Sequence, residues 1–110
     1  MKSKVFFGED ALKESFEKLN SSTYREDEFL YKWIKRAIED LSANAFCGIQ
    51  IPKTLIPKEY TKKFGIDNLW KYDFPQGWRL LYSVGKEQVE IISIILEWLD
   101  HKEYERRFRY

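Results

Sequence analysis

The run Val89–Leu96 constrains the fold of this chain more than any other part of its sequence. Side chains alternate between the two faces of a strand, and the apolar residues of this run would occupy both faces. We therefore expect it to be the most buried strand of a β-sheet. The run is too short to cross a bilayer and contains Ser93, and no signal peptide is recognisable. These features predict a cytoplasmic protein without membrane contacts.

The rest of the second half has the pattern of an antiparallel sheet. Two strands are predicted at Leu69–Phe74 and Trp78–Val84, and the buried strand at Gln88–Leu96. Residues with turn chemistry separate these strands at 75–77 and at 85–86.

A stripe of apolar residues at helical spacing predicts a long helix over Tyr24–Ala43. The stripe consists of Phe29, Leu30, Trp33, Ile34, Ala37, Ile38 and Leu41. Such a stripe is typical of a helix packed on a core rather than of a cofactor site. Thr23 and Glu26 have the spacing of a capping box at the start of this helix. A shorter helix is predicted over Glu9–Leu19.

The order of the predicted elements defines the fold class. A strand at Lys2–Phe7 precedes the two helices, and a short helix begins after Asp100 and ends near Phe108. The order strand, helix, helix, three strands and short helix predicts an α+β fold, with a helical hairpin packed on an antiparallel-rich sheet. We expect the first strand to pair with a later one. A chain of 110 residues, 44% of them hydrophobic, is suited to one domain over 1–110.

Charge and cysteine content limit the classes of function. The formal net charge is only +1, but acids outnumber bases by nine to six between Glu9 and Asp40, whereas bases outnumber acids by eleven to nine from Leu41 onward. An anionic partner should therefore prefer the second half, unless these charges form ordinary solvated faces. The single cysteine, Cys47, is interpreted as a small buried hydrophobic residue. No cluster of cysteine or histidine suggests a metal, and we expect no cofactor.

The irregular segment Asn44–Ile66 is the first candidate for a functional loop, because long connections often carry function. It holds the lysines Lys53, Lys58, Lys62 and Lys63 against one acid, Glu59. These lysines could bind RNA phosphates or form a plain solvated loop. Lys62 or Lys63 could lie near the sheet if 60–64 forms a helical turn.

Two motifs in the last forty residues resemble a known family. The sequence Gly-Trp-Arg-Leu-Leu-Tyr at 77–82 is similar to a strand of the RelE/ParE toxins, in which the arginine is functional. After the apolar strand, Asp-His-Lys-Glu-Tyr at 100–104 is similar to the basic or histidine-containing ending of that family. The order of the predicted elements also resembles these toxins across almost the whole chain.

The resemblance implies the toxin of a type II toxin–antitoxin system that inhibits translation. Such a protein would be a metal-free endoribonuclease, an mRNA interferase, whose partners are a cognate antitoxin, messenger RNA and the ribosome. By resemblance, Arg79 would bind the phosphate near the scissile bond, where a planar guanidinium suits phosphate. Alternatively, Arg79 forms a salt bridge to Asp73 or lies on the surface. A two-residue turn would place Arg79 opposite Tyr72, and one more residue would place it opposite Asp73.

His101 and Tyr104 complete the candidate catalytic set. His101 is the only histidine and the only side chain whose ordinary pKa suits acid–base chemistry near neutrality. Tyr104 could act as a phenolic acid or base, or stack on a nucleobase. Each also has a structural interpretation, His101 as an exposed helix-start residue and Tyr104 as a side chain that holds the helix to the core.

The bases of the terminal helix add to the predicted RNA-binding set, because cations interleaved with aromatics suit RNA. They are Lys102, Arg106 and Arg107, and Arg109 follows them. Phe108 stands where the family has a terminal tyrosine, and phenylalanine cannot transfer a proton. An alternative is therefore a noncatalytic or ParE-like binding module of the same fold that acts through protein partners. A second alternative is an interaction protein unrelated to toxins.

Overall fold

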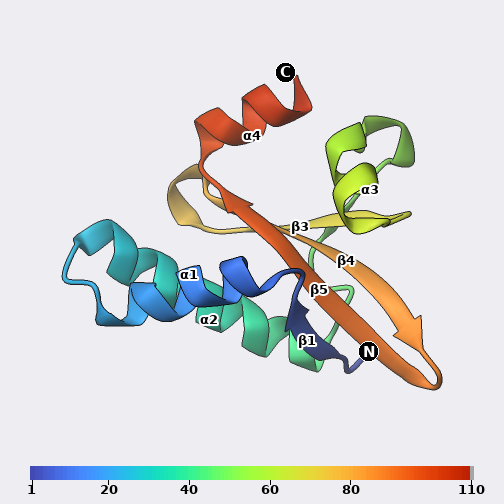
Figure 1. The fold of residues 1–110 in the computed structure, drawn as a ribbon, viewed down its shortest axis with the longest axis horizontal. Coiled ribbons are helices and arrows are strands. Elements are labelled where there is room, and N and C mark those ends of the chain that lie inside the picture. The colour runs from blue at the N-terminus through green and yellow to red at the C-terminus, as the bar shows by residue number, and fades with distance from the viewer. Residues whose placement is uncertain (110) are drawn as a thin grey trace.

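The computed structural model describes residues 1–109 and contains one mixed β-sheet of five strands (Figure 1). The strands lie in the order β1-β5-β4-β3-β2. Strand β1 pairs with β5 in parallel, and the other neighbours are antiparallel. Their bounds are β1 Lys4–Phe7, β2 Ile49–Ile51, β3 Leu69–Asp73, β4 Arg79–Glu87 and β5 Glu90–Leu99.

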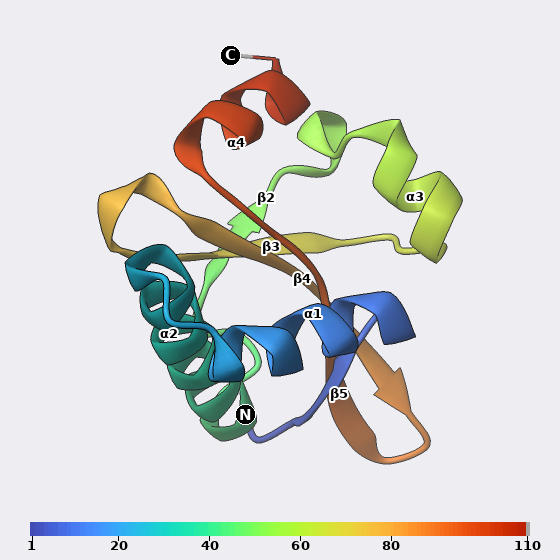
Figure 2. The same ribbon diagram turned by 60° about the vertical axis from the view of Figure 1, so that its left-hand side comes forward.

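Helices cover both faces of the sheet (Figures 1 and 2). Helices α1 (Asp10–Ser21) and α2 (Arg25–Ala43) lie on one face, and α3 (Lys58–Phe64) and α4 (His101–Phe108) lie on the other. The structure therefore confirms the predicted α+β class and the helical hairpin packed on the sheet. The predicted pairing of the first strand with a later one is also confirmed.

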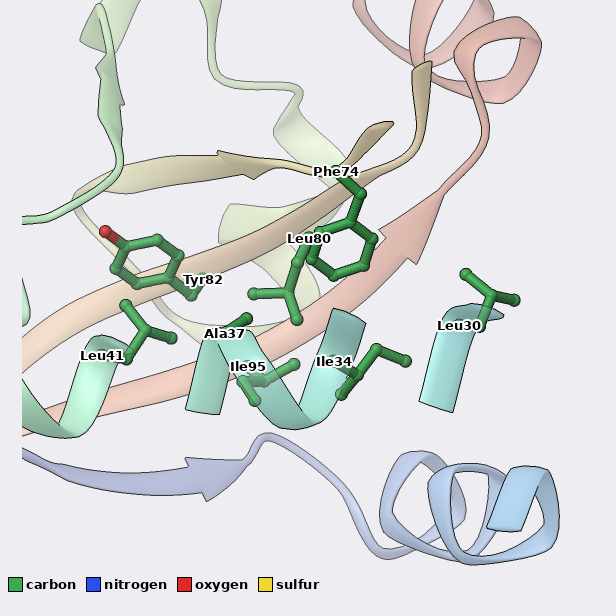
Figure 3. Close-up of a cluster of buried hydrophobic side chains, with 8 residues drawn as sticks. All are labelled: Leu30, Ile34, Ala37, Leu41, Phe74, Leu80, Tyr82 and Ile95. Carbon is green, nitrogen blue, oxygen red and sulfur yellow. The ribbon is translucent and has the colours of Figure 1, made fainter. Parts of the chain in front are cut away.

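The larger core lies between α2 and the sheet (Figure 3). Its buried residues are Leu30, Ile34, Ala37, Leu41, Phe74, Leu80, Tyr82 and Ile95. Four of these belong to the stripe that predicted α2, because residues three and four apart share one helical face. A second core on the other face joins buried side chains of the sheet to Tyr60 of α3 and Tyr104 of α4. This second core fixes where the terminal helix lies.

Four expectations from the sequence are wrong. The turn predicted at 85–86 lies within β4, and the β4–β5 hairpin turns at 88–89 instead. The capping box at Thr23 and Glu26 does not form, because α2 begins at Arg25 and its N-cap, Tyr24, makes no side-chain capping bond. The apolar run is not buried throughout, since Val89 is 90% exposed in the turn where the β4–β5 hairpin extends beyond the helices (Figure 1). Cys47 is exposed rather than buried.

The segment that looked irregular in the sequence is an ordered connection. It contains β2, a short 3-10 helix (Lys53–Leu55) and α3. The buried hydroxyl of Tyr82 donates to the carbonyl oxygen of Ala45 at 2.9 Å and accepts from the amide of Gly48 at 3.0 Å. A Cβ atom at Gly48 would lie 2.5 Å from the carbonyl oxygen of Lys71, so glycine is needed for β2 to approach the sheet. No helix within residues 1–109 is both long and apolar enough for a transmembrane span.

Candidate functional site

Strands β3 and β4 present charged side chains on the face of the sheet that α4 covers. Their register places Arg79 opposite Asp73 and Lys71 opposite Leu81. Of the two turn lengths that the sequence allowed between β3 and β4, this register corresponds to the longer one. The turn includes a 3-10 segment at Pro75–Gly77. Because successive side chains of a strand point to opposite faces of the sheet, Lys71, Asp73 and Arg79 all lie on the face that α4 covers.

Arg79 lies at the centre of this group, and its side chain is only 16% exposed. Its Nη1 donates a hydrogen bond to the carbonyl oxygen of Gly77 and lies 3.2 Å from Nδ1 of His101. Its guanidinium carbon stands 4.3 Å from the centroid of the Tyr104 ring, a cation–π contact that orients the planar group. Its Nε lies 3.8 Å from the carboxylate of Asp73 and makes no hydrogen bond within the described chain.

His101 is the first residue of α4 and is exposed to solvent. The helix begins there because Asp100 caps it, with a carboxylate oxygen that accepts from the amide of Glu103 at 2.8 Å. Nε2 of His101 contacts the carboxylate of Glu105, and Nδ1 faces Arg79. A guanidinium only donates, so neutral His101 carries its hydrogen on Nε2 and has its lone pair on Nδ1. The basic nitrogen of His101 therefore faces Arg79.

Tyr104 supports Arg79 from within the second core, where it is 3% exposed. Its ring stacks on Phe108 with 4.4 Å between centroids. Arg79, His101 and Tyr104, the three residues predicted as catalytic, thus lie together, although β4 and α4 are separated by a whole strand. The exposed imidazole lies at the rim of the group, and the buried tyrosine ring forms its floor.

Lys71 belongs to the same group and was not predicted from the sequence. Its Nζ lies 3.3 Å from the carboxylate of Asp73 and 5.7 Å from the centroid of the Tyr104 ring, and its side chain is 21% exposed. The sequence contained a signal, the i and i+2 spacing of Lys71 and Asp73. That signal could be used only once the register of the hairpin was known. Lys71, Asp73, Arg79, His101 and Tyr104 are called the Arg79 cluster below.

Arg107, predicted to bind RNA, lies in a network that joins three elements. Its guanidinium donates to both carboxylate oxygens of Glu97 at 3.0 and 3.2 Å and lies 3.5 Å from Glu59. Tyr60 donates to the same Glu97 carboxylate at 2.7 Å. Burial and this hydrogen bond raise the pKa of Tyr60 far above its ordinary value. The network attaches α4 to β5 and α3.

The other predicted RNA-binding residues lie outside the Arg79 cluster. Lys63 pairs with Glu9 at 3.1 Å, and Arg106 pairs with Glu103 at 2.7 Å. The remaining four, Lys53, Lys58, Lys62 and Lys102, are exposed. Lys58, Lys62 and Lys63 belong to α3. Residues 60–64 are therefore helical, which was the condition for Lys62 or Lys63 to lie near the sheet.

The Arg79 cluster has the parts of a phosphate-binding site. Two cations, Arg79 and Lys71, lie beside one carboxylate, and an imidazole nitrogen points toward the guanidinium. A phosphate oxygen could replace Gly77 as the acceptor for Nη1 of Arg79 and could accept from its Nε, because charge-assisted bonds to phosphate are the stronger ones. No protein-family model, curated protein or solved structure matches this chain.

Proposed function

We propose that this protein is the toxin component of a type II toxin–antitoxin system and a metal-free endoribonuclease. Its substrate would be messenger RNA, bound on the ribosome as the resemblance to RelE/ParE toxins implies, and a cognate antitoxin would restrain it. The observation that carries the proposal is the convergence of Arg79, His101 and Tyr104, with 3.2 Å between Nη1 of Arg79 and Nδ1 of His101 and 4.3 Å between the guanidinium and the Tyr104 ring.

The proposed reaction is attack of a 2′-hydroxyl on the adjacent phosphate. When Arg79 binds the phosphate, its Nη1 leaves Nδ1 of His101. Nδ1 then removes the proton of that hydroxyl, and the new bond forms between the 2′-oxygen and phosphorus. Arg79 stabilises the negative charge that develops on the phosphate oxygens. The bond to the 5′-oxygen breaks, and the Lys71 ammonium supplies its proton. The products are a 2′,3′-cyclic phosphate end and a 5′-hydroxyl end.

Two neighbours of the reacting groups, Glu105 and Tyr104, orient His101 and Arg79 for this reaction. Glu105 accepts from Nε2 of His101 and so keeps the lone pair on Nδ1. The Tyr104 ring sets the plane of the guanidinium. In this arrangement Tyr104 acts through Arg79 as a positioning residue, a role that differs from both proton transfer and stacking on a nucleobase, the two functional roles predicted for it.

The proposal is tested by controlled expression of the wild type and of three variants, Arg79→Ala, His101→Ala and Lys71→Ala. Growth is recorded and RNA ends are mapped, with 5′-hydroxyl ends distinguished from 5′-phosphate ends. In the wild type we expect growth arrest with new 5′-hydroxyl ends. In the variants we expect no growth arrest and at least about 100-fold fewer new 5′-hydroxyl ends. Arg25→Ala is the control, because Arg25 is an exposed residue at the start of α2, on the opposite face of the sheet. Absence of arrest at verified folded expression would overturn the proposal.

A second candidate function is a noncatalytic or ParE-like module of the same fold that acts on protein partners. The contact between His101 and Arg79 favours it, because a lone pair on Nδ1 that already accepts from a guanidinium cannot take a proton from a substrate without movement of Arg79. Growth arrest without new RNA ends would support this candidate over the nuclease.

A further inference from the structure

An open groove of about 820 Å³ lies beside α4 at the end opposite to His101. One wall is formed by residues 54–59, which run from the 3-10 helix into the first residues of α3, and the other by residues 106–109 at the end of α4. Eight helical residues span about 12 Å, so the groove is separate from the Arg79 cluster but adjoins it along one helix. We call it the α4 groove.

The charges that line the α4 groove are mostly positive. Lys58, Arg106, Arg107 and Arg109 face one acid, Glu59. Glu59 and Arg107 lie 3.5 Å apart and largely cancel each other. Lys58 and Arg109 form no ion pair within residues 1–109, and the side chain of Arg106 is 78% exposed despite its pair with Glu103. The groove thus has cations available for an anionic ligand.

The walls of the groove are held by ordered structure. Arg107 is fixed by both oxygens of Glu97. On the opposite wall, the amide of Leu55 donates to the carbonyl oxygen of Pro52 at 2.9 Å, and that of Tyr60 donates to Pro57 at 3.1 Å. Leu55 is 52% exposed, so the groove also offers an apolar surface for a sugar or base. A nucleic-acid strand needs this combination of cations and apolar surface.

We propose that the α4 groove binds phosphates of the RNA nucleotides that flank the scissile phosphate. This inference rests on the proposed function, because it takes the Arg79 cluster as the position of the scissile phosphate. The single-stranded RNA would lie along α4, with one phosphate at Arg79 and a neighbouring part of the strand between Lys58 and Arg106. The ligand is a ribose–phosphate chain, bound mainly by charge and therefore in a salt-dependent way.

The test measures binding of the full chain to single-stranded oligonucleotides by fluorescence anisotropy over a range of salt concentrations. The oligonucleotides carry 2′-O-methyl groups, which remove the attacking hydroxyl and prevent cleavage. One is short enough to occupy only the Arg79 cluster, and the other also reaches the groove. The groove variant is Lys58→Gln with Arg106→Gln. The control is Lys32→Gln with Lys35→Gln, which removes the same charge from exposed residues of α2.

We expect the groove variant to bind the long oligonucleotide about tenfold more weakly than the wild type, and the slope of log K against log salt to fall in magnitude by about 1.4. Binding of the short oligonucleotide should not change, and the control should bind both like the wild type. Unchanged binding of the long oligonucleotide, or an equal loss in the control, would overturn the inference. If the wild type binds through the groove but produces no new 5′-hydroxyl RNA ends in cells, the groove stands as an RNA site and only the nuclease proposal fails.

Discussion

At the scale of single residues, Gly77 controls how the β3–β4 turn meets the candidate site. Its φ of +80° is a left-handed conformation that disfavours side chains. A Cβ atom there would lie 2.8 Å from Cβ of His101. Its carbonyl oxygen also accepts from Arg79. One glycine therefore allows the turn, Arg79 and His101 to approach one another.

We expect Gly77→Ala to lower the free energy of unfolding by about 1–2 kcal/mol because of its positive φ, and also to displace His101 and reduce RNA cleavage. Gly65→Ala is the matched control, because Gly65 has a φ of +65° but no atom within 4 Å of a Cβ there. Denaturant unfolding and cleavage are measured for both. If the two variants lose the same stability and the same activity, contact with His101 has no part in the effect.

At the scale of elements, α4 is attached to the sheet by the Glu97 carboxylate, which accepts from Tyr60 and Arg107. Both members of the Glu97–Arg107 pair are about three-quarters buried. Removal of one partner from a buried, hydrogen-bonded ion pair lowers the free energy of unfolding by more than an exposed ion pair adds to it. The position of Tyr104, and with it that of Arg79, therefore depends on β5 and α3 as well as on α4.

We expect Glu97→Gln to lower the free energy of unfolding by about 1–3 kcal/mol and to speed amide hydrogen exchange selectively in α4. Glu103→Gln is the control, since it breaks an exposed pair with Arg106 that is worth less than about 1 kcal/mol. Exchange is followed by mass spectrometry of peptides from α4. Equal protection of α4 in both variants would show that the Glu97 network does not hold the helix.

The long elements of this fold could be predicted from the sequence, but the short ones could not. The apolar stripe of α2 repeats over more than three turns, whereas β2 has three residues and α3 has seven, too few to establish a period. Strand β2 is held by its pairing with β3 and by the hydroxyl of Tyr82, more than thirty residues away in the chain. Distant contacts of this kind leave no local pattern.

The candidate site, like the fold, could be predicted from the sequence only in part. Arg79, His101 and Tyr104 were found through motifs, and the fold brings them together. Lys71 was missed because its face of the sheet depends on the register of the β3–β4 hairpin, and a shift of one residue reverses every side chain. The ion pairs of Arg107 were equally hidden, because Glu97 and Glu59 lie on other elements.

At the scale of the whole molecule, three tyrosine hydroxyls join separate layers. Tyr60 donates to Glu97 between α3 and β5, Tyr72 donates to Asp40 between β3 and α2, and Tyr82 donates to Ala45 beside the central strand. Burial raises the pKa of all three hydroxyls well above the ordinary value near 10, and hydrogen bonds to the carboxylates raise those of Tyr60 and Tyr72 further. Ionisation of these tyrosines therefore opposes folding.

The expected consequence is a cooperative loss of stability in alkali. In the unfolded chain these tyrosines ionise near pH 10, whereas in the folded chain their raised pKa values keep them protonated. Their contribution to stability is fully present below about pH 10 and is lost as the pH rises above it. Tyrosinate absorbance and far-ultraviolet circular dichroism are followed together from neutral pH into alkali. We expect part of the absorbance to rise only as the dichroism is lost, and that part to be smaller by one tyrosine in Tyr60→Phe. Complete ionisation before any loss of dichroism would show that these hydroxyls do not hold the layers together.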